Sequence, residues 1–225
     1  MRRGLSIGIL VICIACAAPQ QRFNIAELRS DAERGDMNAV VAMGLLYDSG
    51  AEVTKDQAEA ARWYHIAAEK GHAEAQNSLG SMYQAGEGVP QDYSLAVRWY
   101  SLASDQGHFE AMNNLGYMYD LALGVPEDNT RAADLYNRAA EEGSIKAMLN
   151  LGVMLGQGEK GVDRDVVRAF MWLDLARFYT QMSRDMQLKW KVRGALDELK
   201  KQMTPLQITR GEKLTKEWDA AHRKR

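Results

Sequence analysis

The hydrophobic positions of this chain recur with a period of 36 residues from about Ile25 to Tyr179. Within each period, apolar residues stand three and four positions apart, which is the pattern of amphipathic helices. Several residue types keep the period together, and the in-register glycines are Gly44, Gly80, Gly116 and Gly152. A fixed period of roughly 20 to 50 residues indicates stacked supersecondary units, so we expect a solenoid.

Each period predicts two helices. In the second unit, Ala75 and Leu79 belong to the stripe of a first helix, and Gly86 suits the positive φ wanted just past a helix end. Pro90 prevents the helix from continuing. Asp92 is placed to cap a second helix, whose inner face is expected to comprise Ala96, Trp99, Tyr100 and Ala103.

The in-register glycines fall in the middle of the first helices. An interior glycine costs a helix about 1 kcal/mol relative to alanine. A cost that recurs in every unit needs a recurring reason. We expect that the paired helix approaches closely at each of these positions.

The repeated segments LGSMYQAGEGVPQDYSLAVRWYSLASDQGHFEA and LGYMYDLALGVPEDNTRAADLYNRAAEEGSIKA resemble Sel1-like repeats, which are relatives of the tetratricopeptide repeat. The resemblance implies an all-α fold, a right-handed αα superhelix of antiparallel helix pairs. The expected boundaries are a half repeat at 23–35 and repeats at about 36–71, 72–107, 108–143 and 144–180. In the fourth unit, the register shifts by one residue near Gly158 to Gly161.

Two further helices are predicted after the repeats. One stripe comprises Met182, Met186, Trp190, Arg193, Leu196, Leu199 and Met203, and a second comprises Leu206, Leu214, Trp218 and Ala221. Thr204-Pro205 is typical of a cap followed by the first helical residue. Repeat arrays need a polar-faced cap at an exposed end, so residues 181–225 are expected to cover the end of the stack.

The first residues predict an export signal. Arg2 and Arg3 precede a charge-free apolar run from Leu5 to Ala18, which is too short to span a bilayer. Two alternatives remain: a signal peptide over 1–17, or a lipoprotein signal over 1–15 with an acylated Cys16. We therefore expect export to a bacterial periplasm, with a lipid anchor at Cys16 as the sole membrane contact and a tether to the outer membrane as one alternative.

Composition excludes several classes of protein. The 225 residues are 46% apolar and 26% charged, with a net charge of −2, which disfavours disorder and a nucleic-acid partner. The charge is segregated, because residues 17–182 carry 14 basic and 24 acidic residues and residues 183–225 carry 12 and 6. A basic end can attract anionic lipid or nucleic acid. The apolar stripes around it favour a cap that simply packs on an acidic stack.

No motif points to catalysis. The chain has 4 histidines, and His72 and His108 occupy the same repeat position, at the start of a helix, rather than converging on one site. Zinc, phosphate-loop and nucleophile-elbow motifs are absent from the sequence. We therefore expect no catalytic residue, no metal site and no cofactor.

A binding surface is the positive expectation. By analogy with tetratricopeptide repeats, the first helix of each unit lines a concave face, and its candidate residues are Leu45, Asn77, Ser81, Asn113, Tyr117 and Val153. An asparagine amide can pair with both polar groups of a peptide, and tyrosine is a frequent interface anchor. The prediction is an exported, monomeric scaffold that binds a protein or peptide. The alternatives are an envelope hydrolase or a β-lactam- or peptidoglycan-related protein, and a periplasmic regulator of a membrane signalling system.

Overall fold

The structure is a computed structural model, and it describes residues 24–181 and 183–222. This part of the chain forms helices joined by loops, with one isolated bridge between Glu159 and Val162. The helices are α1 (Ile25–Glu33), α2 (Met37–Ser49), α3 (Gln57–Glu69), α4 (Ala73–Ala85), α5 (Tyr93–Asp105), α6 (Phe109–Asp120), α7 (Asn129–Glu141), α8 (Ile145–Gln157), α9 (Val166–Thr180), α10 (Met186–Lys200) and α11 (Pro205–His222).

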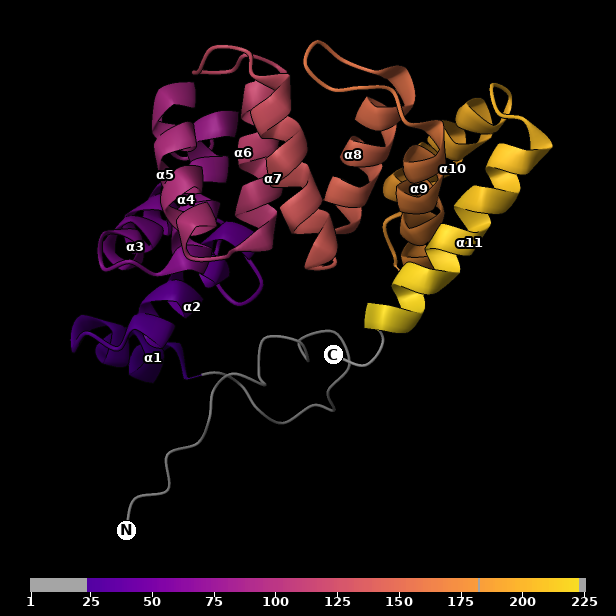
Figure 1. Cartoon of the computed structure of the whole chain (residues 1–225). Coiled ribbons are helices and arrows are strands. Elements are labelled where there is room, and N and C mark those ends of the chain that lie inside the picture. The colour runs from indigo at the N-terminus through magenta and orange to yellow at the C-terminus, as the bar shows by residue number, and fades with distance from the viewer. Residues whose placement is uncertain (1–23, 182, 223–225) are drawn as a thin grey trace.

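The helices form a curved array (Figure 1) in which each helix from α1 to α10 packs against its neighbours in the chain, whereas α11 packs on α9. The tightest pairs are α2 with α3, α4 with α5, α6 with α7 and α8 with α9. Among the described residues, helix α1 packs mainly on α2. The predicted all-α helical repeat solenoid is confirmed.

The second helix of every unit begins at an aspartate, as predicted for Asp92 in the second unit. Asp92 accepts a hydrogen bond from the backbone N–H of Leu95, and the same N-cap recurs at Asp56, Asp128 and Asp165. The carboxylate satisfies an N–H group that has no partner inside the helix. The first helix of the second unit ends at Gly86 with φ of 74°, also as predicted.

The in-register glycines mark where paired helices touch. A Cβ atom added to the glycine would lie 2.7 Å from Tyr64 at Gly44, 2.7 Å from Tyr100 at Gly80, 2.9 Å from Tyr136 at Gly116 and 2.7 Å from Leu173 at Gly152. Real Cβ contacts are not that short, so each glycine makes room for a buried ring or branched chain on the next helix. The predicted close approach is confirmed.

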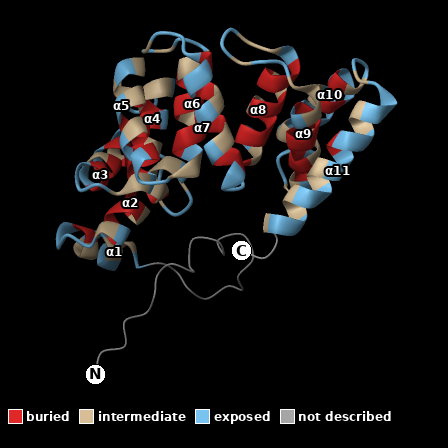
Figure 2. Ribbon diagram, in the orientation of Figure 1, coloured by how far each residue is buried: buried red, intermediate tan, exposed pale blue. Residues whose placement is uncertain are grey.

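The core is a strip along the array rather than a single centre. Buried residues occupy the inward sides of successive helices, whereas the outward sides and the loops are exposed (Figure 2). Packing is continuous from α1 to α10 through two adjoining clusters of buried side chains. In the fourth unit, the shifted register forms a small hairpin closed by the Glu159–Val162 bridge.

The first cap helix corrects one prediction. Helix α10 buries Val192, Leu196 and Leu199 against α8 and α9, whereas Met186 is 62% exposed and Trp190 is 79% exposed. The predicted stripe is therefore wrong for these two residues. The packed face is centred on Val192, and Met186 and Trp190 lie on the opposite side of the helix.

The second cap helix docks on α9. Thr204 and Gln207 form a reciprocal capping box at its start, which confirms the predicted cap. The buried Gly211 faces Phe170, and the Trp218 ring meets Trp172 edge-on at 5.6 Å. The predicted stripe is wrong at its ends, because Leu206 and Ala221 are exposed.

The predicted signal segment, including Cys16, lies outside the described residues, as does Met182. Among the residues that are described, no helix is both long and apolar enough to cross a membrane.

Candidate functional site

The predicted binding residues lie on one side of α2, α4, α6 and α8, which we call the first-helix face. Ser81 and Tyr117 are exposed, Tyr117 to 39%. Leu45, Asn77 and Val153 are half-buried. Asn113 differs from the others, because it is buried at 6% exposure.

Four asparagines form a continuous hydrogen-bonded chain across three repeats. Asn150 Nδ2 donates to Asn113 Oδ1 at 3.0 Å, and Asn113 Nδ2 donates to Asn114 Oδ1 at 3.3 Å. Asn114 Nδ2 in turn donates to Asn77 Oδ1 at 3.0 Å. Because all the bonds run in the same direction, the chain leaves amide N–H groups at its Asn77 end and a carbonyl oxygen at its Asn150 end.

This chain corrects the role predicted for Asn113. Both polar atoms of its side chain bond to asparagines of the array, so its amide links α6 to α8 instead of facing a peptide. Sequence reasoning also missed Asn114 and Asn150. The sequence did indicate them, because Asn114 and Asn150 are 36 residues apart. They occupy the repeat position that follows the one held by Asn77 and Asn113.

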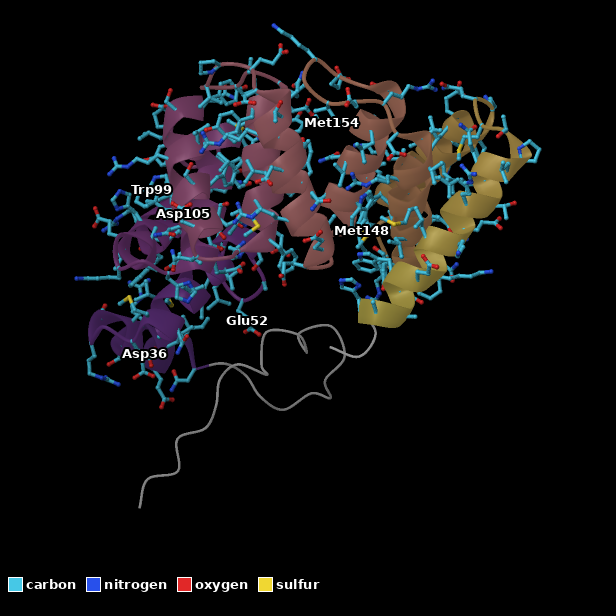
Figure 3. All side chains as sticks on the ribbon, in the orientation of Figure 1. Asp36, Glu52, Trp99, Asp105, Met148 and Met154 are labelled. Carbon is cyan, nitrogen blue, oxygen red and sulfur yellow. The ribbon has the colours of Figure 1, made fainter. Side chains whose placement is uncertain are left out.

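A hollow of about 420 Å³ lies at the C-terminal end of the first-helix face. Its walls come from α6, α8, the fourth-unit hairpin and α10, and comprise Asp120, Leu149, Asn150, Val153, Met154, Gln157, Glu159, Lys191 and Ala195. Figure 3 labels Met154 where α8 enters this region. The predicted Val153 and the carbonyl end of the asparagine chain therefore share one cavity with three charged side chains.

The Asp120 carboxylate is held in place at the rim of this hollow. Its Oδ2 atom accepts a hydrogen bond from the Tyr136 hydroxyl at 3.1 Å. Burial raises the pKa of Asp120, although the bond from Tyr136 opposes that effect. Lys191 lines the same hollow from α10, so side chains of opposite charge border it.

His108 links two repeats at the edge of the first-helix face. Its Nδ1 atom accepts from the backbone N–H of Ala111 at 3.2 Å, and its Nε2 atom lies 3.1 Å from Glu74 Oε2. The hydrogen bond to Glu74 raises the pKa of His108 and lowers that of Glu74. His72, at the same repeat position, starts α4 without a side-chain cap.

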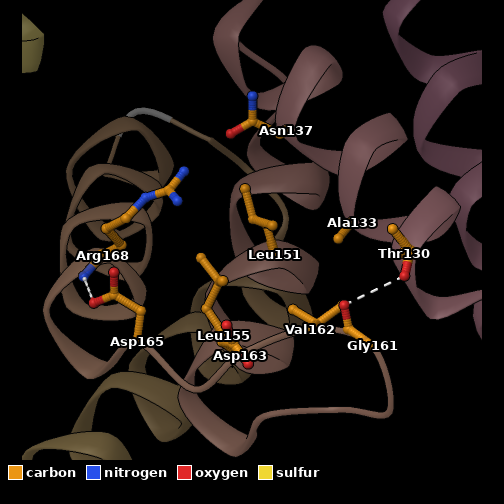
Figure 4. Close-up of a pocket in the computed structure, with 10 residues that line it drawn as sticks. All are labelled: Thr130, Ala133, Asn137, Leu151, Leu155, Gly161, Val162, Asp163, Asp165 and Arg168. Carbon is orange, nitrogen blue, oxygen red and sulfur yellow. Dashed lines mark hydrogen bonds between the residues drawn. The ribbon is translucent and has the colours of Figure 1, made fainter.

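A second hollow, of about 330 Å³, lies between α7, α8, α9 and the fourth-unit hairpin (Figure 4). Its polar groups serve the local fold: Thr130 donates to the Gly161 carbonyl at 3.3 Å, and Asp165 caps α9 by accepting from Arg168 N–H. Such groups do not pair a nucleophile with a base. Across the described residues, no group of three or more His, Cys, Asp or Glu side chains is arranged to hold a metal ion.

The Sel1 repeat family matches this chain over residues 38–72, 73–108, 109–144 and 145–177. The chain belongs to the Sel1 repeat family. Sel1 repeat proteins are generally helical scaffolds, and their repeats commonly mediate protein interactions. No curated protein matches the sequence significantly.

Solved structures include similar Sel1 repeat chains. A Sel1 repeat protein from Oxalobacter formigenes is 37% identical, with a TM-score of 0.52 over 56% of this chain and 96% of that one. Cysteine rich protein B of Helicobacter pylori is 21% identical, with a TM-score of 0.45 over 56% and 95%. The protective antigen c5321 of uropathogenic Escherichia coli is 20% identical, with a TM-score of 0.34 over 87% and 63%.

Proposed function

We propose that this Sel1 repeat protein is a non-catalytic scaffold that binds a protein or peptide partner on its first-helix face. The observation that carries the proposal is the apolar surface next to the hollow at α6 and α8. Tyr117 on α6 and Leu121, the C-cap residue of that helix, stand one turn apart and are 39% and 49% exposed. Asp120, between them in sequence, lines the hollow together with Val153.

The geometry describes what such a partner would present. An apolar side chain can pack on Tyr117 and Val153, because an exposed aromatic beside a partly enclosed cavity resembles the centre of an interface hot spot. Backbone groups of the partner can accept from Asn77 Nδ2 and donate to Asn150 Oδ1, the two ends of the asparagine chain. The partner would then cross α4, α6 and α8 in turn.

Export remains part of the proposal and rests on the sequence alone. Arg2, Arg3 and the following apolar run support a periplasmic location, with removal of residues 1–17 or acylation of Cys16 as the alternatives. Mass spectrometry of the N-terminus of protein from the native envelope distinguishes these alternatives. An uncleaved chain recovered in the cytoplasmic fraction would contradict export.

Affinity capture from the native envelope, followed by mass spectrometry, tests the binding proposal. Tyr117→Ala combined with Val153→Glu is expected to lower partner affinity by about tenfold or more. Ile66→Ala, at a 44% exposed apolar position on α3, is the matched control and should capture normally. Equal capture by all three proteins, with unchanged helicity, would refute the assignment of this face.

A panel of ester, amide and β-lactam substrates tests the non-catalytic part of the proposal. The expected result is turnover no greater than that of a heat-denatured control. Turnover above that control, retained after purification, would show an enzyme and overturn the proposal.

A further inference from the structure

The first cap helix carries a hydrophobic surface that the fold leaves open. Trp190 is 79% exposed and Met186, one turn earlier, is 62% exposed. Both residues lie opposite the packed face of α10, which is buried against α8 and α9. Helix α11 docks on α9 (Figure 1), and both side chains remain exposed. Neighbouring exposed apolar side chains with a polar border are typical of interaction sites.

The charge around this surface is of one sign. From Arg184 to Arg193, the chain carries Arg184, Lys189, Lys191 and Arg193 against the single acidic Asp185. Among the described residues, only Arg193 of these four cations lies within 4.0 Å of a carboxylate, at 3.8 Å from Asp197. The Lys189 ammonium donates to the Gln181 carbonyl at 3.1 Å. An apolar ridge with a cationic border is thus presented to solvent; we call Met186, Trp190 and these four cations the cap patch.

We propose that the cap patch docks on the surface of an anionic phospholipid bilayer. Tryptophan favours the membrane–water interface, where its ring lies among acyl chains and its N–H meets headgroups. Lysine and arginine side chains can keep their charges at the phosphates while their stems cover apolar surface. The segregation of charge would also orient the protein on the membrane. The repeats are acidic overall, with 14 basic and 24 acidic residues over 17–182. An anionic surface would repel the repeats and attract the cap.

The size of the patch favours a bilayer over a second copy of the chain. A large aromatic side chain buries roughly 150–250 Å². Two large side chains therefore supply well under the roughly 800 Å² per partner that a stable dimer interface needs. Peripheral membrane binding can instead combine a few inserted side chains with electrostatic attraction. The cap patch fits that second set of requirements.

The test measures binding of the full chain to vesicles by tryptophan fluorescence. The emission of Trp190 is obtained by subtracting the spectrum of Trp190→Phe from that of the native chain. Vesicles of phosphatidylglycerol and phosphatidylcholine are compared with vesicles of phosphatidylcholine alone. All variants keep residues 1–23, so any contribution from that segment is common to them. The expected result is a shift of Trp190 emission to shorter wavelength with the anionic vesicles only.

Variants separate the apolar and the charged contributions. Arg184→Glu with Arg193→Glu should lower the partition coefficient by about tenfold or more, and Trp190→Ala should lower it as well. Leu206→Ala, a 61% exposed apolar position on α11, and Lys160→Glu, an exposed cation of the fourth-unit hairpin, should bind like the native chain. Circular dichroism checks that each variant keeps its helices.

Three results would overturn the proposal. The first is an unchanged Trp190 emission while the chain sediments with anionic vesicles, and the second is equal partitioning of Trp190→Ala and the native chain. The third is a concentration-dependent dimer, seen by sedimentation equilibrium, that Trp190→Ala abolishes, since the patch would then be an interface between copies. Partner capture on the first-helix face should survive in Trp190→Ala, which keeps this proposal separable from the proposed function.

Discussion

Gly80 and Gly194 are both interior helix glycines, and they differ in what lies beyond the missing side chain. A Cβ on Gly80 would lie 2.7 Å from the Tyr100 ring, whereas nothing lies within 4 Å of one on Gly194. We predict that Gly80→Ala lowers the free energy of unfolding by about 1–3 kcal/mol, because the buried ring must shift. Gly194→Ala should raise the free energy of unfolding by about 0.5–1 kcal/mol, because alanine has the higher helix propensity and its methyl group meets no other atom. Urea denaturation measures both; equal effects would contradict the packing account.

The His108–Glu74 pair predicts a pH dependence of stability. The raised pKa of His108 adds stability that is present below its ordinary value of 6.5 and is lost as pH rises through the folded-state value. The lowered pKa of Glu74 adds stability that is present above 4.5 and is lost as pH falls through the folded-state value. The contribution of the pair should therefore be greatest between about pH 4.5 and 6.5, and it should fall toward pH 8.5.

Urea midpoints of the native chain and Glu74→Gln at pH 5.5 and pH 8.5 check this prediction. The difference in unfolding free energy should be under about 1 kcal/mol, because the Glu74 side chain is half exposed, and smaller at the higher pH. Glu87→Gln, an exposed loop carboxylate, is the control and should show no such trend. A difference that grows toward pH 8.5 would contradict the sign of both shifts.

Residues whose role is local were predictable from the sequence, and those whose role is tertiary were not. Asp92 caps a helix because of its own position in the chain. Gly80 lowers the stability of its own helix, so its recurrence in every unit indicated a close neighbour at that position. In the sequence, the position of Asn113 in its helix looks the same as that of a polar residue that faces solvent. Its burial depends on a neighbouring repeat supplying Asn150, which single-residue reasoning does not include.

At the scale of elements, the docking of α11 on α9 yields a prediction. A Cβ on the buried Gly211 would lie 2.5 Å from the Phe170 ring, and Phe170 belongs to the core of the array. Gly211→Ala should therefore loosen α11 and raise hydrogen exchange at its amides, while α2 to α5 keep their protection. Lys216→Ala, at an exposed position of the same helix, is the control. Protection in α11 that is unchanged by Gly211→Ala would refute this contact as its anchor.

The elements themselves were predictable, but the packed faces of the two cap helices were only partly so. In the repeats, each helix has copies 36 residues away that confirm which side is buried. Helices α10 and α11 have no copies. Their apolar residues spread over more than one side, so the stripe through Met186 and Trp190 was as good a candidate as the observed face around Val192.

At the scale of the whole molecule, the net charge of −2 conceals two opposed regions, and the architecture explains why they remain separate. In an array, each unit contacts only its neighbours, so a basic cap at one end does not neutralise acidic repeats at the other. The stacked helix pairs followed from the 36-residue period, and the fold class followed from the resemblance to Sel1-like repeats. The exposure of the cap patch could not be predicted in this way, because it depends on which side of α9 packs against α11.

The same architecture predicts how loss of the cap would spread. Deleting residues 182–225 would expose Phe170 and Trp172, which now face Gly211 and Trp218 of α11 and are 1% and 2% exposed. Because repeats are stabilised by their nearest neighbours, α8 and α9 should lose hydrogen-exchange protection, whereas α2 to α5 should keep most of theirs. Exchange measured by mass spectrometry on the full and the shortened chain tests this gradient. An equal loss of protection in every helix would instead show that the array and its cap unfold as one cooperative unit.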